Sequence, residues 1–228
     1  MPSAAAEPKQ SPQPARPTSG LAATRVESLS DGVFSIVMTL LVLDLRVPDI
    51  GASGSALQLR EALGALWPFA VGYLMSFVTA GSLWIAHRGQ YHFIRRTDRA
   101  LLWINIIFLV FVSAIPFFTA LLARYPSFRL PIVLYGANMI CALLALLGHW
   151  IYATRGHRLA SADLTAAAID AQSRRILIGP AIYLTAILAA IWWSPVVSLL
   201  LYACVPAAFA LPSALDRHWH RHGEAPSG

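Results

Sequence analysis

Ionisable and hydroxyl side chains gather at the start of one long apolar segment. Arg25, Glu27, Ser30 and Asp31 stand in a polar turn, and an apolar run follows from residue 32 to residue 43. At about 1.5 Å of rise per residue, a helix of this length crosses the roughly 30 Å hydrocarbon core of a bilayer only if the polar turn sits at or just inside one interface. A carboxylate at that depth is costly unless it is paired or faces water. Asp31 therefore requires partners from other helices.

Two kinds of chemistry suit this turn. In the first, Arg25, Ser30 and Asp31 are structural and hold their helix in one orientation through bonds to neighbouring helices. In the second, Asp31 and His87 take up and release protons in turn, since an imidazole titrates near neutral pH. For Asp31 we adopt the structural interpretation. For His87, a hydrogen-bonded residue at a helix end is favoured at least as strongly as a proton-handling residue, and both alternatives stay open.

The two faces of this helix differ. With an advance of about 100° per residue, Ile36, Thr39, Leu40 and Leu43 share one side, a column of aliphatic side chains interrupted by a single hydroxyl. Asp31 points to the other side. If Asp31 anchors the helix, the face of Ile36 is left free for another role.

The composition places these elements in a membrane. Hydrophobic residues make up 57% and charged residues 12% of the chain, and the mean hydropathy is +0.60. This is more apolar and less charged than an ordinary soluble domain. The 228 residues leave room for one polytopic domain and no sizeable soluble one. The net charge of +6 does not indicate nucleic-acid binding, because the basic residues are spread over short loops.

We therefore predict an all-α polytopic membrane protein with six transmembrane helices. A tail rich in proline, residues 1–20, is predicted to be disordered, residues 21–216 form the six-span domain, and residues 217–228 form a second tail. A short interfacial helix is expected over residues 56–66 and another short helix near residues 166–168. Pro116 is expected to kink the third span. The predicted spans are residues 25–45, 67–87, 101–122, 130–153, 174–193 and 195–215.

The charges of the loops predict the orientation. Six spans place both termini on one side, together with the loops after the second and fourth spans, and the positive-inside rule puts the side richer in Lys and Arg in the cytosol. We therefore expect a multi-pass protein of the cell membrane with both termini cytosolic. The richer side holds Lys9, Arg16, Arg25, Arg88, Arg95, Arg96, Arg99, Arg155, Arg158, Arg174, Arg175, Arg217 and Arg221, and the other side holds Arg46, Arg60, Arg124 and Arg129.

Other chemistry is sparse. Cys141 and Cys204 lie inside predicted spans, which favours neither a disulfide framework nor a zinc site. There is no glycine-rich phosphate loop, nucleophile elbow or pair of catalytic carboxylates, so we expect no enzyme, no metal site and no cofactor. The C-terminal histidines His218, His220 and His222 are interpreted as part of a solvated basic tail.

The polar turn at the start of the first span resembles a known family signature. The run R-V-E-S-L-S-D, residues 25–31, resembles the R-x-x-x-F-S-D signature on the first helix of the transmembrane protein 175 family of potassium channels, with Leu29 where the family has Phe. Further similarity covers about residues 24 to 215. It includes the ordered matches Tyr73, Ser76, Phe77, Trp84, His87, Asn105, Pro116, Phe117 and Thr119.

The resemblance implies a homotetrameric, potassium-permeable channel lined by the first helix. Ile36, Leu40 and Leu43 would form hydrophobic constrictions and Thr39 a hydroxyl layer, with no carbonyl filter of the TVGYG kind. The implied partners are other copies of the chain, the lipid bilayer and monovalent cations. The implied helix-packing network consists of Arg25, Ser30, Asp31, Trp84, His87 and Asn105.

The alternative function is a proton-coupled secondary transporter, or a proton-conducting channel, that uses Asp31 and His87. Transporters usually carry inverted repeats and broken helices at the membrane midplane, and the sequence shows neither clearly. Asp44, near the other end of the first helix, either draws cations to a pore mouth or is an interface residue whose carboxylate reaches water. A structural membrane scaffold is a third possibility.

Overall fold

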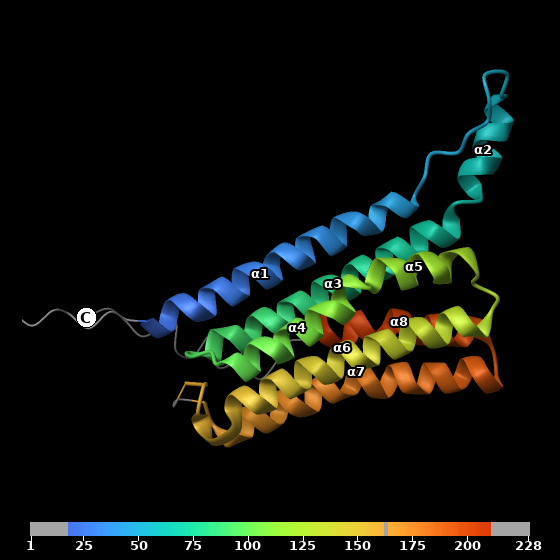
Figure 1. Cartoon of the computed structure of the whole chain (residues 1–228). Coiled ribbons are helices and arrows are strands. Elements are labelled where there is room, and N and C mark those ends of the chain that lie inside the picture. The colour runs from blue at the N-terminus through green and yellow to red at the C-terminus, as the bar shows by residue number, and fades with distance from the viewer. Residues whose placement is uncertain (1–17, 162–163, 211–228) are drawn as a thin grey trace, which may run out of the picture.

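The computed structural model describes residues 18–161 and 164–210. Over these residues the chain is helical, apart from connecting turns and an isolated bridge between Ile94 and Ala160. Figure 1 shows the long helices lying side by side in one elongated bundle. The elements are α1 (Thr18–Leu40), the 3-10 turn η1 (Leu41–Asp44), α2 (Ala56–Gly64), α3 (Trp67–Phe93), α4 (Arg99–Ser113), α5 (Ile115–Arg124), α6 (Arg129–Thr154), the 3-10 turn η2 (Arg155–His157), α7 (Ala166–Trp192) and α8 (Pro195–Ala210).

Five segments of the described chain are long and apolar enough to cross a membrane, with mean hydropathies between 1.6 and 2.6. They are Ala23–Asp44, Trp67–Phe93, Arg99–Arg124, Arg129–His157 and Ala166–Trp192. Each matches one of the first five predicted spans. Helix α8 covers most of the sixth, and its apolar part, Pro195–Pro206, is shorter than the others. The bundle is an all-α polytopic membrane protein.

The ends of the predicted domain fall largely outside the described residues. Of the predicted tail, residues 1–20, only residues 18–20 are described, and they begin α1. The second tail, residues 217–228, with its three histidines, lies outside the described residues altogether.

The third span is broken into two helices at Pro116. Helix α4 ends at Ser113, and Pro116 stands in the first turn of α5. Proline has no N–H for the carbonyl four residues earlier, and its ring crowds that turn, so one continuous helix is disfavoured. The side-chain amide of Asn138, on α6, donates a hydrogen bond to the carbonyl of Phe111 in the last turn of α4 (3.0 Å). A polar side chain thus serves the backbone next to the break, where lipid could not.

The expected short helix near residues 166–168 is not separate. Helix α7 begins there and continues without interruption to Trp192, so the helix of the fifth span starts eight residues before Arg174. The Thr165 hydroxyl caps it by accepting from the N–H of Ala168 (3.3 Å). Alanine has the highest helix propensity, so the run of alanines extends the helix from its capped start.

The core is centred on α6. Trp150, Tyr135 and Met139 of this helix are fully buried. Tyr202 on α8 packs against Tyr135, with ring centroids 5.4 Å apart, and donates its hydroxyl to the carbonyl of Ile132 (2.8 Å). Gly136 permits this approach, because a Cβ there would lie 2.2 Å from the Tyr202 oxygen.

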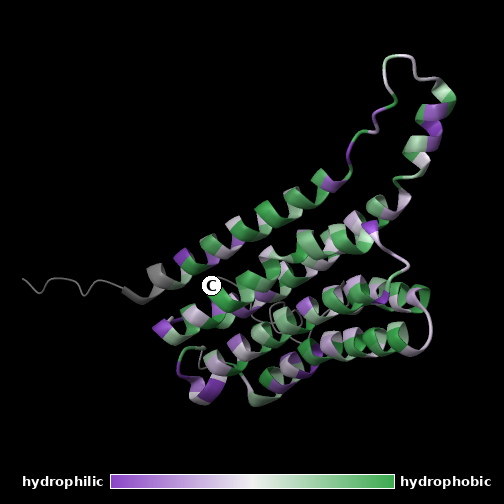
Figure 2. Cartoon of the chain, turned by 45° about the vertical axis from the view of Figure 1, so that its right-hand side comes forward, coloured by the Kyte–Doolittle hydropathy of each residue, from purple (hydrophilic) through white to green (hydrophobic). Residues whose placement is uncertain are grey.

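Helix α2 stands away from the bundle. Ser55 and Gln58 form a capping box at its start, and none of its residues is buried. Figures 1 and 2 show it projecting beyond the end of the bundle, with hydrophilic colours concentrated on it and at the ends of the long helices. It occupies the position of the short helix expected over residues 56–66.

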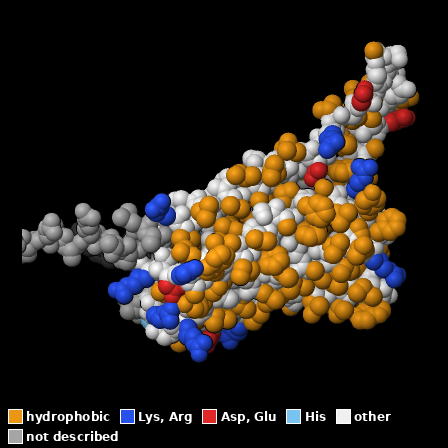
Figure 3. Space-filling view, viewed as in Figure 1, with side chains coloured by type: hydrophobic (Ala, Val, Ile, Leu, Met, Phe, Trp, Pro, Cys, Tyr) orange, Lys and Arg blue, Asp and Glu red, His pale blue; other side chains and the backbone are white. Residues whose placement is uncertain are grey.

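Positive charge is concentrated at one end. Figure 3 shows most of the basic side chains at the end of the bundle where α1 begins, and fewer at the opposite end, with a broad apolar surface between them. This is the distribution that a protein crossing a membrane requires.

Candidate functional site: an exposed helix face and its anchor

Helix α1 and the turn η1 that continues it share an exposed apolar face. The exposed fractions are 59% for Ile36, 41% for Leu40 and 64% for Leu43, and Thr39 is also exposed. These are the four residues that the sequence assigns to one side of the helix. The single chain therefore leaves uncovered the face that would line a pore.

The other face of α1 is packed. Phe34, Val37 and Leu41 are almost completely buried in the core of the bundle. Phe34 contacts Phe108 of α4 and His87 of α3, with ring centroids 6.0 and 6.2 Å apart. The rotation of α1 about its own axis is thus set by large side chains on one side only.

Hydroxyl groups run along the exposed face beside the aliphatic residues. The Thr39 hydroxyl donates to the carbonyls of Ile36 (2.8 Å) and Ser35 (3.0 Å), and the Ser35 hydroxyl donates to the carbonyl of Asp31 (2.8 Å). Ser28 is exposed in the same way. Because these protons are used within the helix, the oxygen lone pairs are left to face outward. Of these hydroxyls only Thr39 lies on the face of Ile36 as the sequence predicts it; Ser35 and Ser28 are also exposed, because the exposed side of the helix is wider than that face.

Asp31 is held by an aromatic donor. The indole N–H of Trp84, on α3, donates to Asp31 Oδ1 (2.7 Å), and both side chains are half-buried. A charge-assisted bond of this kind is stronger than one between neutral groups. It ties the polar turn of α1 to α3. Arg25 is exposed, and no described residue forms an ion pair with it.

A second, fully buried connection joins α1, α4 and α3. The amide nitrogen of Asn105 donates to Ser30 Oγ (3.2 Å), and the amide oxygen of Asn105 lies 2.9 Å from His87 Nε2. The exposed fractions of Ser30, Asn105 and His87 are at most 1%. The imidazole of His87 also stacks on Phe108, with centroids 5.2 Å apart and planes 9° apart. The structure therefore brings together Ser30, His87 and Asn105, and places Asp31 with Trp84.

The network continues to α6 through residues that sequence reasoning missed. His149 lies 2.9 Å from Gln90 Oε1 through Nδ1 and 3.1 Å from the Tyr91 hydroxyl through Nε2. Its ring centroid is 5.7 Å from that of His87. No pattern in one sequence links His149 to residues nearly 60 positions away. The sequence does show that His149, Gln90 and Tyr91 are polar residues near the ends of apolar spans, and such residues need hydrogen-bond partners.

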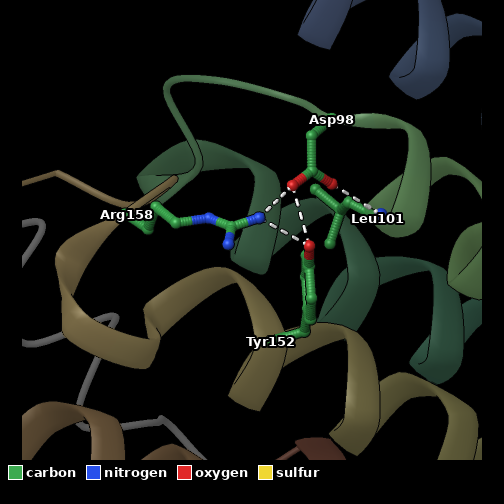
Figure 4. Close-up of polar contacts among 4 residues, drawn as sticks. All are labelled: Asp98, Leu101, Tyr152 and Arg158. Atoms are coloured by element: carbon green, nitrogen blue, oxygen red, sulfur yellow. Dashed lines mark hydrogen bonds and ion pairs between the residues drawn. The ribbon is translucent and has the colours of Figure 1, made fainter.

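A polar cluster at the basic end of the bundle joins the start of α4 to the end of α6 (Figure 4). Asp98 caps α4 by accepting from the N–H of Leu101 (2.9 Å), and it accepts a hydrogen bond from the Tyr152 hydroxyl (2.8 Å). Arg158 forms an ion pair with Asp98 and donates to Tyr152 (2.7 Å). Partial desolvation opposes ionisation, but these hydrogen bonds and the Arg158 charge hold the pKa of the Asp98 carboxyl below its ordinary value of 3.8.

This cluster predicts a pH-dependent contribution to stability. Since the pKa of Asp98 is lowered by folding, its charge stabilises the fold above about pH 4, and the contribution is lost as the pH falls through the lowered value. Asp98→Asn keeps a helix-capping side chain but removes the charge. We expect the variant to be less stable than the wild type near neutral pH and equally stable in strong acid, as measured by thermal unfolding in detergent at several pH values. A difference that is independent of pH would contradict the role of the charge.

The described part of the chain contains no group of three His, Cys, Asp or Glu residues placed to hold a metal ion. Asp44 lies half-buried in η1, at the far end of the exposed face from Arg25.

Comparisons with known proteins agree on one family. Residues 25–116 match the family described as endosomal/lysosomal potassium channel TMEM175. A potassium channel of Streptomyces collinus is 37% identical over 159 residues, which are 68% of this chain and 76% of that protein. The endosomal/lysosomal proton channel TMEM175 of Mus musculus is 38% identical over 135 residues, 54% of this chain and 26% of that protein.

A solved structure extends the likeness to the fold. The crystal structure of a lysosomal potassium-selective channel TMEM175 homolog from Chamaesiphon minutus superposes with a TM-score of 0.73 at 29% identity. The superposition covers 84% of this chain and 97% of that one.

Proposed function

This chain belongs to the TMEM175 family of ion channels, and from that premise we infer that it is a potassium-permeable membrane channel. We propose further that four copies place α1 around a common axis, with Ile36, Leu40 and Leu43 as hydrophobic constrictions and Thr39 as a hydroxyl layer. The permeant ion is K⁺, and no cofactor takes part.

The observation that carries this proposal is the uncovered face of α1. A helix whose other side is fixed by Phe34, Val37 and Leu41 presents Ile36, Leu40 and Leu43 outward at 41–64% exposure. Hydrophobic rings conduct when they widen enough to stay wet, and otherwise close the pore by dewetting. The outward lone pairs of Ser35 and Thr39 supply oxygen atoms to a cation between the rings.

The need for several copies follows from the sequence. It contains no internal repeat, so a symmetric pore requires identical subunits around one axis. The number four comes from the family resemblance. The apolar exposed face of α1 supports an assembled state, because each copy would cover part of the face of the next.

The orientation is proposed from charge. The end of the bundle where α1 begins carries most of the arginines (Figure 3), which supports a cytosolic location for that end and for both termini. The cell membrane is the proposed location.

Proton permeation is the second candidate. The mouse relative is named a proton channel, and the buried imidazoles of His87 and His149 lie close together. However, both rings already have hydrogen-bond partners: His87 bonds to Asn105, and His149 bonds to Gln90 and Tyr91. We therefore give His87 and Asp31 the anchoring role, and we assign any proton flux to the same α1-lined path.

The test is flux from liposomes that contain the purified protein. A potassium gradient drives the flux, with a proton ionophore as the return path. A channel gives protein-dependent flux that stays proportional to the gradient, whereas a carrier gives slow, saturable, coupled uptake. Flux that needs no ionophore would indicate that the protein conducts protons itself. No flux from a folded, oligomeric sample would contradict the channel assignment for this chain.

A further inference from the structure

An apolar groove of about 300 Å³ opens at the end of the bundle opposite the start of α1. Three segments wall it: the first turns of α3, the end of α5 with the following loop, and the first turns of α8. Trp67, Pro126 and Val196, at the ends of these segments, mark the outer end of the groove, which we call its mouth, and Met75 and Ala203 lie further along α3 and α8. All of the lining side chains are apolar.

The dimensions of the groove fit one leaflet of a bilayer. From Trp67 to Met75, α3 rises about 12 Å at about 1.5 Å per residue. Half of the hydrocarbon core is about 15 Å thick. The groove therefore runs from the membrane interface towards the midplane, along the direction of a lipid chain.

A concave shape distinguishes this site from the rest of the lipid-facing surface. Lipid tails are as apolar as leucine, so apolar character alone would not retain a chain in preference to bulk lipid. A chain in the groove contacts protein on several sides instead of one, and these many small dispersion contacts add up. Trp67 at the mouth is 65% exposed, as is usual for tryptophan at an interface.

A cationic residue lies next to the groove in the chain, with its guanidinium over the ring of Tyr125 (6.0 Å to the centroid). Arg124 follows directly on the lining residue Ala123, in the last turn of α5, and is exposed. No described residue forms an ion pair with it. A guanidinium at this depth matches the phosphate of a phospholipid in both charge and geometry.

We propose that this groove binds one acyl chain of a phospholipid whose phosphate is bound by Arg124. The site lies in the leaflet at the end of the bundle where α5 ends. It does not depend on the conduction mechanism, because none of its residues belongs to α1.

Native mass spectrometry of the oligomer, purified in a mild detergent, tests the proposal by counting the phospholipids retained per chain. We expect about one for the wild type. Ala203→Phe fills the groove and should lower the retained amount about tenfold, a change of about 1.4 kcal/mol in the binding free energy. Ala181→Phe is the matched control, since Ala181 is exposed on α7 and does not line the groove.

The phosphate contact has its own pair of variants. Arg124→Gln should lower phospholipid retention, whereas Arg60→Gln, on the projecting helix α2, should not. Retention by Ala203→Phe equal to that of the wild type, or adducts with the mass of detergent only, would overturn the proposal. So would dissociation of the oligomer by Ala203→Phe with phospholipid retained, because the groove would then be occupied by a second copy of the chain.

Discussion

Ile36→Asn is expected to raise the protein-dependent potassium flux through liposomes by about tenfold. The side chain is 59% exposed in the single chain, and in the proposed tetramer it contributes four isobutyl-sized groups to one ring. Four asparagine side chains of similar size at the same level would bind water, so the constriction would stay wet. A tenfold change requires the barrier to fall by only about 1.4 kcal/mol, shared by four substitutions.

Two variants on other faces control for non-specific effects. Met38→Asn alters a half-buried residue that packs against the core, and Ile107→Asn alters an α4 residue that is 50% exposed. Both introduce the same polar group into a membrane helix without altering the Ile36 face. We expect neither to raise the flux, although Met38→Asn should lower the yield. If Met38→Asn raised the flux and Ile36→Asn did not, the pore face would be wrongly assigned.

Asn105→Leu is expected to destabilise the folded protein by about 2–4 kcal/mol. Asn105 is the residue that connects Ser30 of α1 to His87 of α3. The substitution removes both hydrogen bonds and leaves a buried imidazole nitrogen without its partner. Hydrogen bonds between membrane helices average about 0.6 kcal/mol, and an unpaired buried polar atom adds about 1–3 kcal/mol. Thermal unfolding followed by gel filtration in detergent measures the loss.

The matched control lies on the same helix. Ser113 is exposed, and its hydroxyl bonds only to the carbonyl of Val110 within α4. Ser113→Leu therefore makes a change of polarity without breaking a bond between helices, and it should leave the unfolding temperature nearly unchanged. Equal loss in the two variants would mean that Asn105 stabilises α4 only through its own helix.

The sequence was a good guide to the spans and to the faces of α1. Long apolar runs are enough to locate the membrane helices. The helical advance of about 100° per residue is enough to place Ile36 and Asp31 on opposite faces of α1. The family motif was needed to expect Trp84, His87 and Asn105 beside the polar turn. His149 and its bonds to Gln90 and Tyr91 were missed, because contacts between distant residues depend on how neighbouring helices are rotated. The length of α7 was also underestimated, since the charged residues near its start resembled a loop.

The break at Pro116 divides the third span into two helices, α4 and α5, whose axes can change their angle independently. Helix α4 is hydrogen-bonded to α1 through Asn105 and Ser30. Helix α5 is hydrogen-bonded to α3, because the Thr119 hydroxyl donates to Ser76 Oγ (2.7 Å). A tilt of α1 would therefore act on α4 through Asn105 and on α3 through Trp84, and the break at Pro116 would let α4 and α5 respond separately. Because α4 is also bonded to α6 through Asp98 and Tyr152, a motion of α4 would be transmitted to α6 as well as to the break.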